Sequence, residues 1–240
     1  MGLSVGDMCN LGHKSWLAFF GMGQVLESNM QNREDYWSTF YSGIVDRDVL
    51  QPPSQFAAFA AQEIDKGSVV FEVGCGNGRD SLFFAELGFK VVALDKSQNA
   101  IEATQIGSKR RGLKNIECIT GDVSSETFAS AIADITTQNV CVYARFFLHS
   151  ITDEEQATFF ETLSETLKPG HKLAFEYRTE QDQFLEKDAP PHFRRYQNAS
   201  DLNDQLEAFG FKCLYQIEGQ GYAKYKSEDA IVSRAIFEKI

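Results

Sequence analysis

The sequence has no long apolar segment and no cysteine pair, and each absence excludes a class of protein. The longest early apolar stretch, residues 16–22, contains glycine and is too short to span a bilayer. Only Lys14 precedes it as a basic residue nearby, so it does not resemble a signal peptide. The five cysteines are an odd number without a C-x-x-C pair, which is typical of free thiols in a reducing compartment. We therefore expect a cytoplasmic protein that does not associate with a membrane.

Basic residues and clustered metal ligands are also few. Lysine and arginine number 23 against 34 aspartates and glutamates, which gives a formal net charge of −11. Such a charge repels a phosphate backbone, so general nucleic-acid binding is not expected. The four histidines are far apart and form no H-x-x-x-H or Cys/His pattern, so no metal site is predicted. We expect a small-molecule substrate and a monomer or homodimer.

The length and composition fit one folded domain. The chain has 240 residues, of which 43% are hydrophobic, enough for one sizeable core but too few to favour two. Residues 1–30 differ in texture from the rest, so they are either a flexible N-terminal extension or the result of a translation start placed before Met30. We assign residues 31–240 to a single domain, with a helical cap at 31–66 and a Rossmann-like core at 67–240.

Short apolar runs alternate with amphipathic segments from residue 69 onward, which is typical of βα units around a parallel sheet. Strands are predicted at 69–73, 90–94, 115–120, 139–144 and 171–177, and helices at 81–87, 98–111, 124–135, 153–167 and 199–209. Thr152, with Glu155 three residues later, is the predicted N-cap of the fourth of these helices. Two further strands, 211–217 and 231–237, follow one another without a helix and should form an antiparallel hairpin. The sequence thus predicts an α/β fold, with a doubly wound, seven-stranded, mostly parallel sheet.

The most informative segment is the run Val69-Val-Phe-Glu-Val-Gly-Cys-Gly-Asn-Gly-Arg-Asp80, in which a buried strand enters a glycine-rich turn and then a helix. Glycine permits positive φ angles and lets the backbone approach a ligand more closely than a side chain would allow. Asp95 ends the next strand, and Asp122 follows the third. Singly, each glycine fits an ordinary turn and each acid fits a strand end or a helix cap. Together they predict three strand ends that converge on one nucleoside.

The glycine spacing separates two classes of cofactor. Dinucleotide-binding proteins favour G-x-G-x-x-G with a pyrophosphate at the helix N-terminus, whereas this chain has G-x-G-x-G preceded by Glu72. An adenosine ligand without a pyrophosphate is therefore favoured. With these residues, the chain from about residue 36 to 240 resembles the class I S-adenosylmethionine-dependent methyltransferases. The run from Gly74 to Ala85 is similar to their small-molecule branch, which includes tellurite-resistance and thiopurine methyltransferases.

The resemblance implies S-adenosylmethionine as the cofactor and assigns roles to residues of the motif. Glu72 would help position the amino-acid end of the cofactor, and Arg79 would meet its carboxylate. Asp95 would hold the ribose, and Asp122 with Val123 would flank the adenine. The full set of cofactor-binding residues that the resemblance implies is Glu72, Gly74, Cys75, Gly76, Asn77, Gly78, Arg79, Asp95, Lys96, Asp122, Val123 and Ala144.

The segment after the fourth predicted strand supplies the candidates for catalysis. In the family that the chain resembles, this strand delivers residues toward the transferred methyl group, which indicates Arg145 and His149. His149 either acts as a general base, for which its pKa range is suited, or packs under the following helix. Arg145 binds either an anionic acceptor or a nearby carboxylate such as Glu176.

Aromatic and basic residues near the same sheet edge complete the predicted acceptor site. Tyr177, Arg178 and Arg194 suit a phosphorylated or carboxylated metabolite or a stacked sugar, although an ordinary solvated loop has a similar composition. Tyr36, Trp37 and Tyr41 would form either a lid over the site or only a hydrophobic staple of the cap.

The predicted function is the transfer of a methyl group to a small molecule, and two alternatives stay open. The first is a nicotinamide-dependent reductase that uses the same nucleotide-binding half, although the glycine spacing and the terminal hairpin argue against it. The second is a non-catalytic S-adenosylmethionine-binding protein, which an intact motif beside a blocked acceptor pocket would indicate, since one fold hosts many functions.

Overall fold

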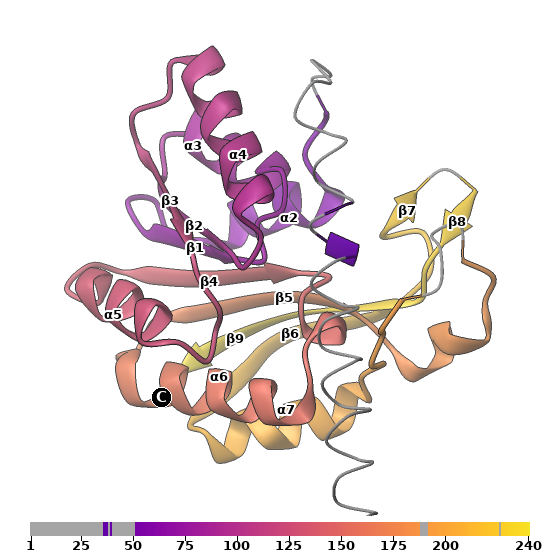
Figure 1. Ribbon diagram of the computed structural model, residues 1–240. Helices are drawn as coiled ribbons and strands as arrows, with labels where there is room; N and C mark the ends of the chain where they lie inside the picture. The colour runs from indigo at the N-terminus through magenta and orange to yellow at the C-terminus, as the bar shows by residue number, and fades with distance from the viewer. Residues whose placement is uncertain (1–35, 38, 40–50, 188–191, 226) are drawn as a thin grey trace, which may run out of the picture.

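The computed structural model describes residues 36–37, 39, 51–187, 192–225 and 227–240. Within them, one seven-stranded sheet has the order β3-β2-β1-β4-β5-β9-β6 (Figure 1). Its strands are β1 (Val69–Val73), β2 (Lys90–Asp95), β3 (Ile116–Thr120), β4 (Val140–Arg145), β5 (Lys172–Arg178), β6 (Phe211–Gly219) and β9 (Val232–Lys239). The predicted seven-stranded α/β fold is confirmed. The predicted extension at residues 1–30 and most of the segment before residue 51 lie outside the described residues.

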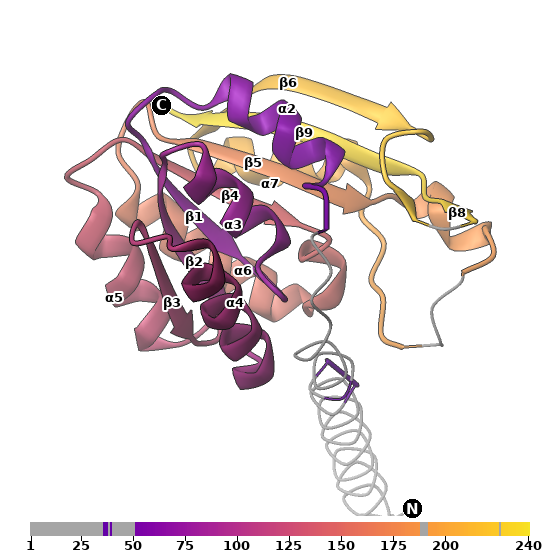
Figure 2. The ribbon, with the colours of Figure 1, turned by 90° about the horizontal axis from the view of Figure 1, so that it is seen from above.

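Helices cover both faces of this sheet (Figures 1 and 2). They are α2 (Gln55–Glu63), α3 (Arg79–Glu86), α4 (Gln98–Arg111), α5 (Glu126–Ile135), α6 (Asp153–Thr166) and α7 (Ala199–Ala208), with 3-10 turns η1 (Leu148–Ser150) and η2 (Glu180–Phe184). One core contains side chains of α5, α6 and α7, and the other contains side chains of α2, α3 and α4. Because both faces are covered, all five residues of β1 are buried, which explains its unbroken apolar run.

The C-terminal strands form the predicted antiparallel pair, and their order in the sheet is a further finding. Strand β9 pairs antiparallel with both β5 and β6, whereas the pairs among β1 to β5 are parallel. The chain therefore runs to the outer edge as β6 and returns between β5 and β6 as β9. Six of the eight residues of β9 are buried, whereas β6 is mostly exposed, as expected for an inner and an edge strand.

A small hairpin that the sequence did not reveal interrupts the connection from β6 to β9. It consists of β7 (Lys224–Tyr225) and β8 (Glu228–Asp229), which pair antiparallel. Ala223, Ala230 and Val232 form a small apolar cluster beside it, against which Phe146 at the end of β4 packs. The hairpin thereby lies close to the carboxyl ends of the central strands (Figure 1).

Local signals set most of the helix boundaries. The predicted capping box at the start of α6 is present, because Thr152 accepts from the Glu155 amide at 3.2 Å and its own amide donates to the Glu155 side chain at 2.8 Å. Helix α3 begins at Arg79, two residues before the predicted start, since Gly78 in the left-handed conformation turns the chain directly into the helix. No helix among the residues described above is long and apolar enough to cross a membrane.

Candidate active site

The glycine-rich turn after β1 approaches two neighbouring strands closely. The amides of Gly74 and Cys75 donate to the carbonyl of Leu94 at the end of β2, at 2.9 and 3.0 Å. Gly74 has a φ of +72°, and a Cβ there would lie 2.8 Å from Cδ2 of Phe147. Gly76 also has a positive φ, of 57°. Gly74 therefore requires glycine for both its backbone conformation and its space, and the positive φ of Gly76 favours glycine.

The third glycine of the motif has a different function. Gly78 caps α3 with a φ of +75°, and a Cβ there would lie 2.5 Å from Cγ2 of Thr104 on α4. Thr104 in turn donates to the carbonyl of Gly76 at 3.1 Å. Gly78 thus permits the close approach of α3 and α4 and is not among the residues that line the cavity described below.

Asp95, at the end of β2, is fixed by backbone donors. Its carboxylate accepts from the amide of Gly76 at 2.9 Å and from the amide of Ser97 at 2.8 Å. Burial raises the pKa of Asp95, and these two hydrogen bonds counteract the effect. A carboxylate has about four acceptor positions, so Asp95 retains acceptor capacity for two hydroxyl groups of a ligand.

Asp122 and Lys96 form an ion pair beside the same edge. Lys96 Nζ lies 3.1 Å from Asp122 Oδ2, and the amide of Ser124 donates to Asp122 Oδ1 at 2.9 Å. Burial alone would raise the pKa of Asp122, but the Ser124 hydrogen bonds and the Lys96 charge outweigh burial and lower it. Val123, the next residue, is buried and lines the cavity. The cavity lining thus has the charged Lys96–Asp122 pair next to the apolar side chain of Val123.

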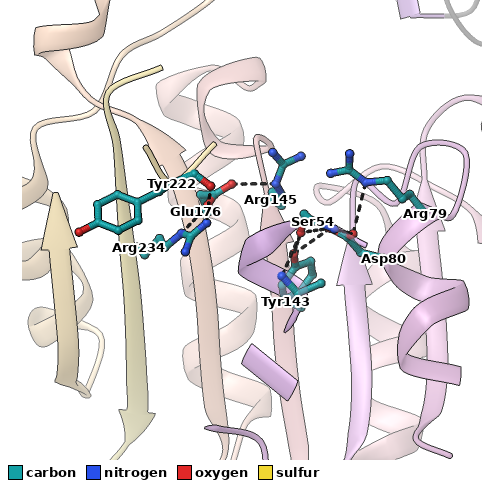
Figure 3. Close-up of polar contacts among 9 residues, drawn as sticks. Ser54, Arg79, Asp80, Tyr143, Arg145, Glu176, Tyr222 and Arg234 are labelled. Atoms are coloured by element: carbon teal, nitrogen blue, oxygen red, sulfur yellow. Dashed lines mark hydrogen bonds and ion pairs between the residues drawn. The ribbon is translucent and has the colours of Figure 1, made fainter. Parts of the chain in front are cut away.

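A buried acidic network lies under the glycine turn (Figure 3). Asp80 accepts from the Ser54 amide at 2.8 Å, from the Ser54 hydroxyl at 2.7 Å and from the Tyr143 hydroxyl at 2.9 Å. Glu72 accepts from the hydroxyl of Ser81, and burial, followed by the charge of Asp80, raises the pKa of Glu72 well above its usual value. The network links the N-cap of α2 with α3 and β4, so it holds α2 against the motif.

Arg79, adjacent to this network, faces the cavity. Its Nε lies 3.4 Å from Oδ1 of Asp80, and its side chain is 27% exposed. The guanidinium retains donors beyond this contact, because arginine has five N–H groups.

Arg145, at the end of β4, is held by a buried carboxylate that is shared with a second arginine (Figure 3). Its Nε donates to Glu176 Oε1 at 2.7 Å, and Arg234 Nε donates to Glu176 Oε2 at 2.6 Å. Arg234 also donates to the carbonyl of Tyr222 at 2.6 Å. Of the two predicted partners for Arg145, the structure shows the carboxylate of Glu176.

Phe146 follows Arg145 in a strained backbone conformation. Its φ is 55°, and it is the single non-glycine residue with a positive φ in the described part of the chain. Its ring contacts two guanidinium groups, with Arg145 Cζ 4.3 Å and Arg178 Cζ 5.1 Å from the centroid. Such strain costs about 1–3 kcal/mol and concentrates at ligand sites. Phe146 lines the cavity.

His149 is buried in η1 and lines the same cavity. Its Nδ1 has no hydrogen-bond partner among the residues that the structure describes, and its ring packs edge-on against Phe146 at 5.5 Å. Burial, followed by the positive charges of Arg178 and Arg194, holds the pKa of His149 well below its usual value. The imidazole is therefore neutral at neutral pH. The ring thus packs against Phe146 and His149 also lines the cavity, so its role as a general base stays a prediction.

The described residues surround one cavity of about 600 Å³ at the carboxyl ends of the central strands, within the usual size range of small-molecule sites. The predicted residues that line it are Glu72, Gly74, Cys75, Gly76, Asn77, Arg79, Asp95, Lys96, Asp122, Val123, Arg145, His149, Tyr36, Trp37, Arg178 and Arg194. The glycine turn and the acids lie at one part of the lining. Arginines and aromatic rings form the other, which we call the acceptor half and define by Tyr36, Trp37, Phe146, His149, Arg178, His192 and Arg194.

Three predicted residues are not brought to this cavity, and one cannot be placed. Tyr177 and Ala144 are buried in the core on the α5–α6–α7 side, and Gly78 packs against α4. The alternation of a strand explains Tyr177, since Tyr177 and Arg178 are adjacent on β5 and must face opposite sides of the sheet. Tyr41 lies outside the described residues.

Comparison with known proteins identifies the family to which this geometry belongs. A family model described as "Methyltransferase domain" matches residues 45–216, which is more than half of the chain. The chain belongs to the class I S-adenosylmethionine-dependent methyltransferases. The methyltransferase is also similar in fold to a solved S-adenosylmethionine-dependent methyltransferase from Anabaena variabilis, with a TM-score of 0.64 and 18% identity over 86% of this chain and 95% of that one.

Two curated relatives of this methyltransferase match over less than half of the chain. A cypemycin N-terminal methyltransferase from Streptomyces is 32% identical over 104 residues, 43% of this chain and 39% of the relative. A 2-heptyl-1-hydroxyquinolin-4(1H)-one methyltransferase from Mycobacteroides abscessus is 28% identical over 104 residues, 40% of this chain and 46% of the relative. The chain thus spans less than half the length of these two relatives.

S-adenosylmethionine is therefore the cofactor, and the residues present in the methyltransferase fit it. The cradle at Gly74 leaves no room for a Cβ, Asp95 has free acceptor positions, and both line one cavity. The sequence did not reveal the buried partners Ser54, Asp80 and Tyr143, or the lining residues Phe146 and Glu228. An acid in the first turn of a helix is common because it interacts favourably with the helix dipole. Asp80 occupies such a position in α3, so its place in the sequence did not distinguish it, although its side chain is buried.

Proposed function

We propose that this methyltransferase transfers a methyl group from S-adenosylmethionine to a small-molecule acceptor. The observation that supports the proposal is the single cavity that joins the glycine turn to the acceptor half. Arg145, Phe146 and His149, at and after the end of β4, line this cavity. The acceptor half forms part of this cavity, which argues against a protein that only binds the cofactor, since such a protein needs no space for a second molecule.

The residues of the glycine turn and of the strand ends bind and orient the cofactor. In this proposal Asp95 accepts hydrogen bonds from the ribose hydroxyls, because two backbone amides already fix its carboxylate. Val123 and the Lys96–Asp122 pair flank the adenine. Arg79 and Glu72, which accepts from the Ser81 hydroxyl, hold the amino-acid end. When bound, S-adenosylmethionine supplies an electrophilic methyl group on a positively charged sulfur.

The acceptor half aligns the nucleophile and keeps water away, which are the main requirements of a direct displacement. His149 is neutral, and its low pKa makes it a weak base. It therefore suits an acceptor that is already anionic or that loses its proton readily. The imidazole would form a hydrogen bond with such an acceptor. Arg145 is a positioning residue in this proposal, because Glu176 fixes its guanidinium beside Phe146.

The proposal includes the acceptor classes named from the sequence, a phosphorylated or carboxylated metabolite or a sugar. Arginines in the acceptor half favour the anionic classes, and the heteroaromatic acceptor named for the Mycobacteroides abscessus relative is in keeping with the aromatic lining. The net charge of −11 supports a small molecule over a nucleic acid. A cytoplasmic monomer or homodimer stays part of the proposal, and the four described cysteines are free.

The direct test is acceptor-dependent formation of S-adenosylhomocysteine from S-adenosylmethionine with the purified protein. We expect turnover with members of a panel of small anionic acceptors and a lower kcat in the His149→Gln variant. The Lys114→Gln variant is a matched control, because Lys114 is exposed, does not line the cavity and precedes the amino end of β3, whereas the cavity lies at the carboxyl ends of the strands. Cofactor binding without turnover for any acceptor in the panel would contradict the proposal.

A further inference from the structure

Two of the three arginines in and beside the acceptor half already have a carboxylate partner within the protein. Arg145 shares the carboxylate of Glu176 with Arg234. Arg178 Nη1 lies 2.6 Å from Asp182 Oδ2, and its Nη2 donates to Glu228 on β8. These guanidiniums hold β4, β5, β9 and the β7–β8 hairpin together, so the protein itself already occupies part of their hydrogen-bonding capacity.

Arg194 is different. In the described part of the chain no carboxylate lies within 4.0 Å of its guanidinium, although the side chain is half-buried and lines the cavity. Burial, followed by the charge of Arg178, lowers the pKa of Arg194, while Tyr196 and Glu228 raise it. A half-buried cation without a direct partner is unfavourable, and a ligand that supplied one negative charge would remove this cost.

Aromatic rings line the same cavity as Arg194 and favour a flat ligand. The rings of Tyr36 and His192 are stacked, with centroids 4.2 Å apart and planes at 22°. Trp37 meets Tyr36 edge-on at 5.0 Å. Together with Phe146 they line the acceptor half. Offset stacking between flat rings contributes about 0.5–1.5 kcal/mol beyond area burial, so a conjugated acceptor is preferred over a compact aliphatic one.

We propose that the acceptor is a planar aromatic carboxylate whose carboxylate group pairs with Arg194. This inference rests on the proposed function and adds the chemical class of the acceptor and the residue that selects it. The Arg194 guanidinium complements one negative charge on a flat ligand, and a dianionic probe in the test below checks whether a single charge is preferred. The carboxylate serves as the recognition group, and the methylated atom lies elsewhere on the ligand.

The test uses the complex of the protein with S-adenosylhomocysteine, so that binding is measured without turnover. Benzoate, 4-hydroxybenzoate, anthranilate and 1-hydroxy-2-naphthoate are titrated by calorimetry, each beside its neutral primary amide, with phenyl phosphate as the dianionic probe. We expect the best carboxylate to bind about 10- to 100-fold more tightly than its amide, the range of a charge-assisted hydrogen bond. This preference should disappear in Arg194→Gln, persist in part in Arg194→Lys and be unchanged in Lys114→Gln.

Three results would overturn the inference: no preference for any carboxylate over its amide, a preference that persists in Arg194→Gln, or tighter binding of phenyl phosphate than of every carboxylate. The comparison of carboxylate with amide needs only the wild-type protein, so it holds even if a variant folds poorly. The affinity for S-adenosylhomocysteine is measured first. Its absence would contradict the proposed function, whereas its presence without a carboxylate preference would contradict only the acceptor class.

Discussion

Replacement of Glu176 by glutamine should destabilise the protein far more than the loss of an exposed carboxylate. The Glu176 side chain is 0% exposed and lies between Arg145 and Arg234, whose Nε atoms are 2.7 and 2.6 Å from its two oxygens. In Glu176→Gln one amide oxygen can still accept from one arginine, but the amide NH2 group faces the donor of the other. Two guanidiniums then lose their shared counter-charge.

Removing one partner of a buried ion pair costs about 3–5 kcal/mol. In a protein of this size each kcal/mol lowers Tm by about 2–4 °C, so Glu176→Gln should lower Tm by about 6–20 °C. The matched control is Glu86→Gln, because Glu86 is 45% exposed and lies 2.8 Å from Arg111 Nη1. An exposed pair contributes about 0–1 kcal/mol, so Tm should fall by no more than about 4 °C.

Thermal and urea unfolding of the three proteins, followed by circular dichroism, measure this difference. A loss below about 1 kcal/mol in Glu176→Gln, or equal losses in the two variants, would refute the view that Glu176 balances two buried arginines. Retention of most stability would also remove the reason for assigning Arg145 a structural ion pair.

Two further variants test backbone strain and proton linkage. Gly78→Ala places a Cβ 2.5 Å from the stiff Thr104 side chain at a φ of +75°, whereas the control Gly112→Ala has a similar φ of +67° and nothing within 4 Å of its Cβ. Urea unfolding should show that Gly78→Ala loses about 1–3 kcal/mol more of the free energy of unfolding than Gly112→Ala. Equal losses in the two variants would contradict the packing role of Gly78. The lowered pKa of His149 means that the unfolded chain binds a proton that the folded chain does not at pH values from about 6.5 down to the folded pKa. The wild type should therefore lose stability more steeply than His149→Gln as pH falls from 7 to 5, by up to about 1.4 kcal/mol per pH unit, and parallel profiles would contradict a neutral buried His149.

The central sheet was accessible from the sequence because burial on both faces leaves an unmistakable pattern. Strand β1 is apolar along its length except at Glu72, and α4 has both of its predicted ends, at Gln98 and Arg111. The antiparallel pairing of β6 and β9 followed from the missing helix between them. Their spatial order did not, because pairing between β5 and β9 joins residues about 60 positions apart and has no local signal.

The site could be predicted from the sequence only in part, because side-chain direction and contacts between residues far apart in the sequence leave little local signal. The acids and glycines of the cofactor half follow strands directly, so chain order places them at one edge. The placement of Tyr177 in the acceptor site was wrong, because neighbouring residues of a strand face opposite sides of the sheet. Arg178 lines the cavity, and Tyr177 therefore faces the core. The partners of Asp80 come from 26 and 63 residues away, and Glu228 comes from a hairpin within a polar loop. Such contacts depend on tertiary packing.

The most direct test of the cofactor assignment is calorimetric titration of the purified protein with S-adenosylhomocysteine, with NADH and NADPH as parallel ligands and Asp95→Ala as the site variant. We predict micromolar binding of S-adenosylhomocysteine, weaker binding by at least about tenfold in Asp95→Ala, and no comparable binding of either nicotinamide nucleotide. Preference for a nicotinamide nucleotide, or undiminished affinity in Asp95→Ala, would contradict the cofactor site described above.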